Sequence, residues 1–360
     1  MYVYIIGTLL SALLSLFAVG NKRLFLRDRE LHVLHRRMGA FFLMILSVFP
    51  LTIISAIRYG VGTDFFSYQA IYTTFRFETS NLEIGVKLLI ALLHKISDNP
   101  QIFFAVTSLW ICVGYYIVIY QNSIDPAYSI CLFVFSQEYF RSMNSIRQFM
   151  ASVIVIQALP AVKEGKLKKV LIYTAIGMLF HMSAFMLIPL YMLCRIHMKP
   201  MQLFILSVIF LLFINSVRGI AVRLARFIGG RYTWYFNSAF AEGNFNPLVV
   251  AIYCAFLLLC EYLYDFQKLK QNETLNFVTS AAFIGMLLFL SRLVLPRNVT
   301  RLAYYMDPVL IIYSPELFRL ISNPKLRIIL KSMAFICYIF VFALAPNSNN
   351  NQLPYQTYWQ

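Results

Sequence analysis

Charged residues are scarce in this sequence. They make up only 13% of its 360 residues, whereas apolar types make up 60%. A soluble protein of this length needs more polar residues than that to cover its surface. Together with a mean hydropathy of +0.70, the scarcity excludes a soluble enzyme, a nucleic-acid-binding module and a disordered chain. The composition instead predicts an all-α polytopic membrane protein, a helix bundle whose surroundings are the lipid bilayer and which has no nucleic acid as partner.

The sequence motifs of several kinds of chemistry are also missing. We find no metal-ligand spacing of His, Cys and Asp, no GxSxG turn and no nucleotide-binding loop. The six cysteines lie in apolar runs without a CxxC pair, which is typical of small buried side chains and not of disulfides. We therefore expect no metal and no cofactor, and the energy for any reaction has to arrive within the substrate.

Apolar runs divide the chain into membrane spans, each of which needs about 20 residues. The first run, Met1 to Gly20, has no basic residue before it and no cleavage motif after it, so we expect a retained span with its N-terminus outside. In all, we predict about twelve transmembrane helices within one polytopic domain at 1–346, followed by a short polar tail at 347–360. The predicted spans are 1–20, 38–57, 101–120, 127–140, 146–162, 169–181, 182–194, 201–217, 247–264, 275–291, 302–320 and 328–346.

Two outer loops, 58–100 and 218–246, separate some of these spans. The amphiphilic stretch Glu83 to Ile96 is expected to dip into the membrane and return, because the Lys-rich turn at 163–169 then lies on the cytoplasmic side, as the positive-inside rule requires. Within the second loop, arginines alternate with apolar residues over 218–228. This pattern predicts an amphipathic helix at the membrane surface, ended by Gly229-Gly230.

Arginine is unusually frequent on the predicted outer side. That side holds eleven Arg and two Lys, whereas the inner side holds ten Lys and eight Arg. A guanidinium presents a rigid fork to phosphate or carboxylate, whereas an ammonium is a point charge on a flexible stem. The arginines could simply pair with outer acids, but five such acids cannot satisfy eleven forks. The excess predicts a site for an anionic ligand on the outer side.

Several groups of residues are candidates for this site. In the first outer loop, the run from Arg58 to Asp64 contains Gly60 and Gly62, which permit a tight backbone beside a charged ligand. The alternative is that Arg58 pairs with Asp64. A second group shares one face at a helix start, where an anion is favoured, and consists of Arg141, Asn144, Arg147 and Gln148.

Two further features concern later parts of the chain. His181 stands among apolar residues at the junction of two short spans, where a neutral imidazole could be a general base or a hydrogen-bonded packing residue. Arg297 and Arg301 precede the span at 302–320, which begins with Tyr304 and Tyr305.

Taken in order, the motifs resemble those of a known family. Arg58-x-Gly-x-Gly-Thr-Asp64, Glu83-x-Gly85, Asn144-x-x-Arg147-Gln148, Phe180-His181-x-Ser183 and Arg301-x-x-x-Tyr305 are similar to segments of the EpsG-like branch of the Wzy polysaccharide polymerases. The resemblance covers about residues 1 to 320 and departs from the usual pattern at Phe65-Phe66, where a Tyr is common. It implies a GT-C-like membrane bundle in the bacterial cytoplasmic (inner) membrane, with its active face extracytoplasmic.

The resemblance also implies a reaction. A growing glycan is transferred from undecaprenyl diphosphate to the next lipid-linked repeat unit, so the partners are undecaprenyl-diphosphate-linked oligosaccharides and the bilayer. A chain-length regulator protein is left open as a further partner. On this reading the arginines hold diphosphate and a carboxylate or His takes the acceptor proton. The candidate bases are Asp64, Glu83 and His181, and the candidate substrate-binding residues are Arg58, Tyr68, Arg141, Asn144, Arg147, Gln148, Arg297, Arg301 and Tyr305.

Other functions remain open at this point. A flippase for lipid-linked oligosaccharide would carry charges through the membrane depth, often with internal repeats, and an O-antigen ligase usually has a longer outer loop than 218–246. A non-catalytic scaffold would not need the outer Arg, Asn, Gln and His residues. The polymerase mechanism requires Arg58, Arg147 and Arg301 to converge around one diphosphate.

Overall fold

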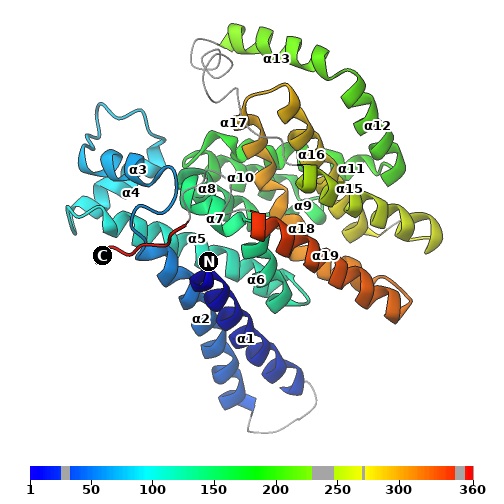
Figure 1. Cartoon of the computed structure of the whole chain (residues 1–360), viewed down its shortest axis with the longest axis horizontal. Helices are drawn as coiled ribbons and strands as arrows, with labels where there is room; N and C mark the ends of the chain where they lie inside the picture. Colours follow the sequence, from blue (N-terminus) through cyan, green and yellow to red (C-terminus); the bar gives the residue numbers. More distant parts are fainter. Residues whose placement is uncertain (26–32, 229–246, 270–271, 345–352, 360) are drawn as a thin grey trace. The chain divides into compact units, whose positions relative to one another are not determined.

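The computed structural model describes residues 1–25, 33–228, 247–269, 272–344 and 353–359 (Figure 1). The described residues form helices joined by short turns, and the only β-type pairing among them is an isolated bridge between Arg58 and Thr357. The prediction of an all-α fold is therefore confirmed.

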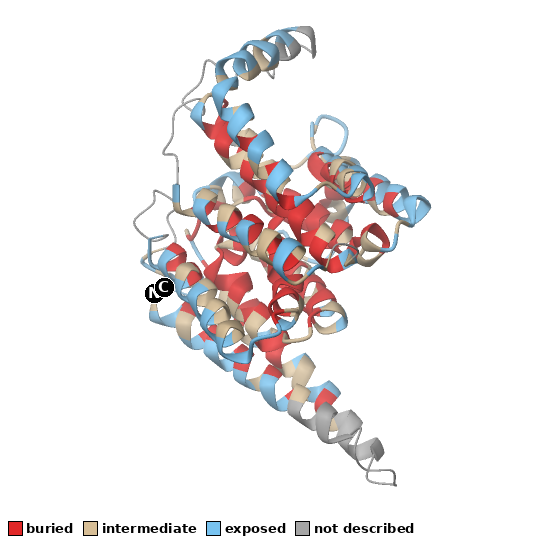
Figure 2. Cartoon of the chain, turned by 90° about the vertical axis from the view of Figure 1, so that its right-hand side faces the viewer, coloured by how far each residue is buried: buried red, intermediate tan, exposed pale blue. Residues whose placement is uncertain are grey.

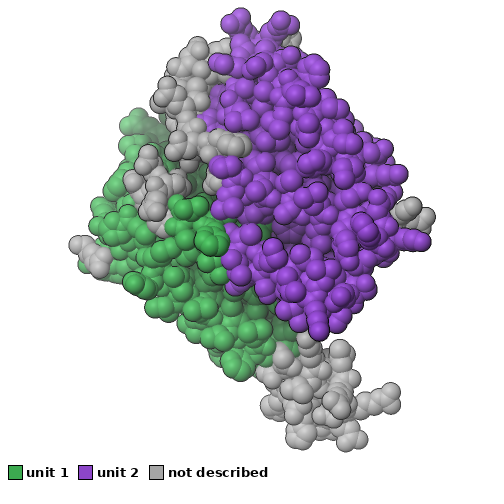
Figure 3. Space-filling model, turned by 45° about the vertical axis from the view of Figure 1, so that its right-hand side comes forward, with its two compact units in different colours: residues 1–158, 172–184, 338–360 green, residues 159–171, 185–337 purple. Residues whose placement is uncertain are grey.

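The chain divides into two compact units, each built from stretches that are separate in sequence (Figure 3). Unit 1 comprises 1–158, 172–184 and 338–360, and unit 2 comprises 159–171 and 185–337. Because the two units alternate along the chain, the grouping of 1–346 as one polytopic domain stays a prediction.

Unit 1 is organised around α5, which packs against α2, α6 and α8, while α1 packs along α2 and against α6. The interior is aromatic. Tyr115 and Phe133 stack with their ring centroids 4.5 Å apart, and both side chains are fully buried. The helices of this unit are α1 (Tyr2–Phe25), α2 (Val33–Ala56), α3 (Phe65–Thr73), α4 (Ile84–His94), α5 (Gln101–Asn122), α6 (Pro126–Phe135), α7 (Glu138–Asn144), α8 (Ile146–Ile156) and most of α10 (Leu167–Met178).

In unit 2, α16 is the central helix and packs against α11, α12, α15 and α18. Gly285 permits one of these contacts, because a Cβ there would lie 2.3 Å from the ring of Tyr253 on α15. The helices of this unit are α9 (Leu159–Lys163), α11 (Leu187–Ile196), α12 (Pro200–Leu212), α13 (Ile214–Ile228), α15 (Pro247–Glu261), α16 (Glu273–Leu290), α17 (Arg297–Thr300), α18 (Asp307–Arg319) and most of α19 (Pro324–Leu344). Shorter 3-10 or π turns are η1 (Met182–Met186), η2 (Tyr262–Phe266), η3 (Ser291–Leu293) and η4 (Arg301–Tyr305).

The long helices are suited to a lipid environment. Within the described ranges, six are long and apolar enough to cross a bilayer, namely Tyr2–Val19, Gly39–Ala56, Gln101–Asn122, Pro247–Phe266, Glu273–Leu293 and Pro324–Leu344. Large apolar side chains such as Leu13, Phe17, Phe41 and Phe340 are more than 45% exposed on their outward faces (Figure 2). Such surface is unfavourable in water and favourable in lipid. The protein is therefore a helical membrane protein.

The count of twelve crossings is not confirmed. Several predicted spans are broken into short helices within the described residues. The span at 127–140 ends at Phe135, because Gln137 has a left-handed backbone (φ 73°) that separates α6 from α7. The span at 201–217 is bent by 72° between α12 and α13. Four apolar helices of 10–17 residues also occur, at Ile84–His94, Pro126–Phe135, Ile146–Ile156 and Met182–Ile196.

The two predicted surface segments have helical counterparts. Helix α4 contains eleven residues, and its length of roughly 16 Å is too short for a bilayer core of about 30 Å. A segment that dips and returns would have such a length. Helix α13 covers the arginine-rich stretch at 218–228 and confirms the predicted helix. The rest of that loop, 229–246, lies outside the described residues, as do 347–352 and 360 of the predicted polar tail.

Candidate functional site

The first part of the site is the loop between α2 and α3, and Arg58 lies at its start. The Arg58 side chain is buried, and its Nη1 donates to the carbonyl of Ser55, to Ser55 Oγ (2.9 Å) and to Ser108 Oγ (3.3 Å). Nη2 donates to the Met143 carbonyl at 3.3 Å, and the guanidinium lies 5.1 Å from the centroid of the Phe104 ring. These contacts join the loop to α5 and to the end of α7.

Arg58 has no carboxylate partner in the described part of the chain, so the alternative that it pairs with Asp64 is wrong. Asp64 instead accepts from the Thr63 hydroxyl at 3.4 Å. Burial lowers the pKa of Arg58 to about 10, which leaves the guanidinium charged at neutral pH. An uncompensated buried charge is costly, so this end of unit 1 carries a positive potential that favours an anion.

Gly62 fixes the approach of the loop to Asn144. The φ of Gly62 is +101°, a backbone conformation that favours glycine, and a Cβ at this position would lie 2.5 Å from Asn144 Oδ1. Asn144 ends α7 and Ser145 separates it from α8. The predicted groups around Arg58 and Asn144, which are distant in sequence, are therefore in contact.

Arg147 joins three helices at the start of α8. Its Nη1 forms an ion pair with Glu83 Oε2 at 2.7 Å, and the side chains are 27% and 20% exposed. Arg147 also lies beside Tyr68 on α3, whose side chain is buried. Burial raises the pKa of the Tyr68 hydroxyl, and the nearby positive charge of Arg147 opposes this increase. Tyr68, Glu83 and Arg147, all predicted site residues, thus lie together, with Glu83 and Arg147 partly exposed and Tyr68 buried beneath them.

Gly85 brings the turn containing His181 to the same region. The Gly85 amide donates to the Leu179 carbonyl at 2.8 Å, and a Cβ on Gly85 would clash with that carbonyl and with the Phe180 ring. Within the turn, His181 Nδ1 accepts from the Ser183 amide (3.2 Å) and lies 2.7 Å from the Ser183 hydroxyl. In the neutral imidazole this acceptor role places the ring proton on Nε2. The start of α4, which follows Glu83, therefore packs against the His181 turn.

Arg141 and Gln148, which the sequence analysis grouped with Asn144 and Arg147, are less exposed than Arg147. Arg141 forms an ion pair with Glu138 at 2.9 Å, and the Glu138 side chain is fully buried and also accepts from the Tyr115 hydroxyl at 3.1 Å. Gln148, on α8, is buried. For Arg141, the alternative that an outer arginine pairs with an outer acid is therefore confirmed, since Glu138 lies three residues before it on the same helix.

The late arginines belong to unit 2. Arg301 begins η4 and is partly exposed, and Tyr305 ends η4 and is buried. Arg297 begins α17, but its side chain lies outside the described residues. The convergence of Arg301 with Arg58 and Arg147 stays a prediction.

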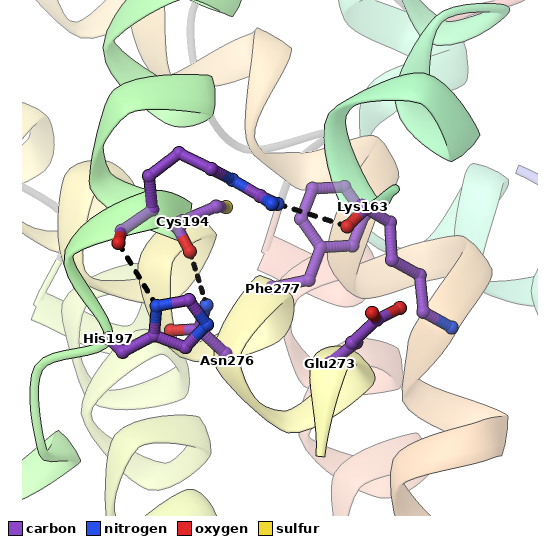
Figure 4. A pocket seen from close by; sticks show the side chains of 7 residues that line it. Lys163, Cys194, His197, Glu273, Asn276 and Phe277 are labelled. Carbon is purple, nitrogen blue, oxygen red and sulfur yellow. Dashed lines mark hydrogen bonds between the residues drawn. The ribbon is translucent and has the colours of Figure 1, made fainter. Parts of the chain in front are cut away.

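Unit 2 also contains a small polar pocket of about 30 Å³ (Figure 4). The Asn276 amide donates to the Cys194 carbonyl at 2.6 Å, and Arg195 Nη2 donates to the Lys163 carbonyl at 3.0 Å. This volume holds little more than a water molecule, so the pocket does not fit a glycan diphosphate. Its lining residues are Lys163, Cys194, Arg195, His197, Glu273, Asn276 and Phe277.

Comparison with known families identifies the chain. The sequence model of the EpsG family matches residues 41–357. The chain belongs to the EpsG family. Membership makes it a membrane protein of polysaccharide biosynthesis, and it confirms the resemblance found in the sequence motifs. The match runs past residue 320, where that resemblance ended, and it includes most of the segment 353–359. Comparisons with curated proteins and with solved structures gave no match.

Proposed function

We propose that this EpsG-family protein is a polysaccharide repeat-unit polymerase. In the proposed reaction, a hydroxyl of a lipid-linked repeat unit attacks the anomeric carbon of a growing glycan held on undecaprenyl diphosphate. The new glycosidic C–O bond forms, the bond to the diphosphate breaks, and the diphosphate leaves with the electron pair. The acceptor proton passes to a side chain of the enzyme. The reaction takes place on the extracytoplasmic face of the bacterial cytoplasmic membrane.

One observation carries the proposal most strongly. In this membrane protein, the guanidinium of Arg147 on α8 meets the partly exposed carboxylate of Glu83, at the start of α4, and the buried ring of Tyr68 on α3 lies beside it. Leaving diphosphate develops negative charge that a fixed guanidinium can stabilise. The leaving group also supplies the driving force, so no nucleotide site is required.

Arg147 and Glu83 suit two linked roles. With no ligand, the carboxylate occupies one nitrogen of the guanidinium, and Arg147 Nε is buried without a hydrogen-bond partner among the described residues. A diphosphate that takes over the Arg147 fork frees the Glu83 carboxylate to accept a proton from the acceptor hydroxyl. We place Asp64 and His181 as the alternative bases, since both belong to segments packed around this group.

The remaining candidates have supporting roles in the proposal. Arg58, buried in the loop, adds positive potential and holds the loop against α7. Asn144 and Gln148 orient sugar hydroxyls, and Arg141 keeps α7 in place through Glu138. We propose that Arg297, Arg301 and Tyr305 also contribute to diphosphate binding.

A gene deletion followed by electrophoresis of the surface glycan tests the proposal. Loss of a polymerase leaves single repeat units attached to their acceptor, in place of a ladder of lengths. Complete loss of transferred glycan indicates a ligase, and accumulation of lipid-linked units on the cytoplasmic side indicates a flippase. An unchanged ladder contradicts all three functions and favours a scaffold.

A further inference from the structure

The segment Leu353–Trp359 pairs with the loop that contains Arg58, about 300 positions earlier in the chain (Figure 1). The Tyr59 amide donates to the Gln356 carbonyl, and the Tyr358 amide donates to the Ile57 carbonyl, both at 3.0 Å. Arg58 and Thr357 thereby form an antiparallel bridge. The loop backbone on both sides of Arg58 is therefore fixed by residues 356–358.

Side chains reinforce this pairing at both ends of the segment. The Tyr355 hydroxyl donates to the Ile54 carbonyl at 2.8 Å, at the end of α2, and its ring packs edge-on against Tyr4 with centroids 5.6 Å apart. Further along, the Asn99 amide donates to the Tyr358 hydroxyl at 2.8 Å. The segment thus connects α1, α2 and the residues just before α5.

The segment also bears on Gly60, the first glycine of the loop motif. A Cβ on Gly60, whose φ is +63°, would lie 3.7 Å from Gln356 Oε1 and 3.5 Å from the Phe66 ring. Loop and segment are therefore packed together as well as hydrogen-bonded. By contrast, Trp359 is 75% exposed, so its side chain contributes little to the pairing.

We propose that residues 353–359 are a positioning element of the candidate site, which holds the Arg58 loop in its working conformation. The inference rests on the proposed function, because the Arg58 loop is a part of that site. The guanidinium is fixed by Ser55, Ser108 and Met143, and the segment supplies the complementary restraint on the Arg58 backbone. Without it, the loop carrying Gly62 and Asp64 loses its alignment with Asn144.

A designed disulfide tests the pairing independently of activity. Tyr59 and Gln356 lie directly opposite each other in the antiparallel pair, a position where Cα atoms are typically about 5.5 Å apart and where a disulfide fits. The experiment introduces Tyr59→Cys and Gln356→Cys into a variant without the six native cysteines. We expect the pair to cross-link in membranes under oxidation, whereas either single variant does not. Absence of the cross-link overturns the pairing.

The same variant separates a fixed element from a moving gate. Because the segment is proposed to stay in place, the cross-linked protein keeps at least half of the polymerisation rate of its reduced form. A cross-linked protein that is inactive, and that recovers on reduction, shows that the segment must leave during turnover. That result overturns the positioning role.

Truncation followed by rescue completes the test. Deletion of 353–360 is expected to lower the maximal polymerisation rate at least tenfold with little change in KM for the lipid-linked substrates, and a synthetic peptide of residues 353–360 supplied from outside is expected to restore it. The control deletion removes only Trp359 and Gln360, beyond the paired residues, and keeps activity. The Tyr355→Phe variant, which lacks only one hydrogen bond, tests the same role in a chain of full length, where misfolding is not expected. It is expected to show a smaller loss of polymerisation rate than the deletion.

These outcomes are distinguishable from a failure of the proposed function. If the wild-type protein forms no polymer, the proposed function fails and the disulfide still reports on the pairing. If the wild type polymerises and the chain lacking 353–360 does so equally fast, the positioning role is overturned and the proposed function stands.

Discussion

Arg147 and Glu83 lie 64 positions apart in the sequence, and their side chains form an ion pair of 2.7 Å. Both side chains are partly exposed, so the pair is screened and contributes only about 0–1 kcal/mol to stability. A weak pair is easily displaced by a doubly charged ligand. This makes the Arg147–Glu83 contact suited to exchange during a reaction and not to holding the fold together.

The first prediction concerns the shape of the Arg147 side chain. The Arg147→Lys variant keeps the charge but loses the fork that binds phosphate at two points. We expect polymer formation to fall roughly tenfold to a hundredfold, the effect of one lost charge-assisted hydrogen bond, while the protein inserts normally. Electrophoresis of surface glycan and an immunoblot of membranes measure the two quantities. A normal glycan ladder in this variant removes Arg147 from the site.

The second prediction concerns proton transfer. If Glu83 is the base, Glu83→Gln keeps its size and a hydrogen bond to Arg147 but cannot accept the acceptor proton, so the maximal rate falls about 10²-fold or more. The corresponding variants Asp64→Asn and His181→Gln are expected to show smaller losses of the maximal rate. Rates with purified lipid-linked substrates provide the comparison. If His181→Gln shows the largest loss and a flattened pH–rate profile, the base is His181.

The third prediction concerns Gly62, which brings the Arg58 loop against Asn144. Gly62→Ala introduces a Cβ 2.5 Å from Asn144 Oδ1 at a positive φ, and such strain costs on the order of 1–3 kcal/mol. We expect a lower melting temperature in detergent and a loss of polymer. Gly39→Ala is the matched control, because a Cβ there has no atom within 4 Å. Equal behaviour of the two variants contradicts the packing of this loop.

The fourth prediction concerns the buried pair of Glu138 and Arg141. Removing one partner leaves the other charge buried, which costs about 3–5 kcal/mol. Glu138→Gln alone is therefore expected to reduce the amount of folded protein strongly, whereas Glu138→Gln combined with Arg141→Met recovers much of it. Fluorescence-detected size exclusion of membrane extracts measures the folded fraction. Additive losses in the double variant argue against the ion pair.

The fifth prediction concerns the two faces of the membrane. A cysteine replacing Lys166 should resist a thiol reagent that cannot cross the membrane, whereas one replacing Asp64 should react. Because the segment 353–359 pairs with the Arg58 loop, Trp359→Cys should react together with Asp64→Cys. The native cysteines are removed beforehand. Labelling at position 166 from outside reverses the proposed topology.

Much of the architecture could be predicted from local sequence. Long apolar runs indicated membrane helices, and alternating Arg and apolar residues indicated α13, because these patterns depend only on neighbouring residues. The contact of Gly62 with Asn144, which joins the Arg58 motif to the Asn144 motif, is a tertiary fact that neither motif shows by itself.

The breaks in the helices could not be predicted in the same way. Gln137 adopts a left-handed backbone conformation that a glutamine does not itself favour. It does so where its side chain donates to the Val341 carbonyl at 2.9 Å, more than 200 positions away. The partners of Arg58 are likewise a serine hydroxyl on α5 and a carbonyl on α7, groups that occur throughout any sequence. Hydropathy averages over such positions, and therefore it does not show where a predicted crossing is broken into short helices.

The bridge between Arg58 and Thr357 has a consequence for biogenesis. Since the ribosome makes residue 357 about 300 residues after Arg58, the loop after the second helix lacks its partner segment while the intervening helices are synthesised. Insertion of the early helices thus precedes completion of the site, and a nascent chain in the membrane remains inactive until residues 353–359 have joined that loop.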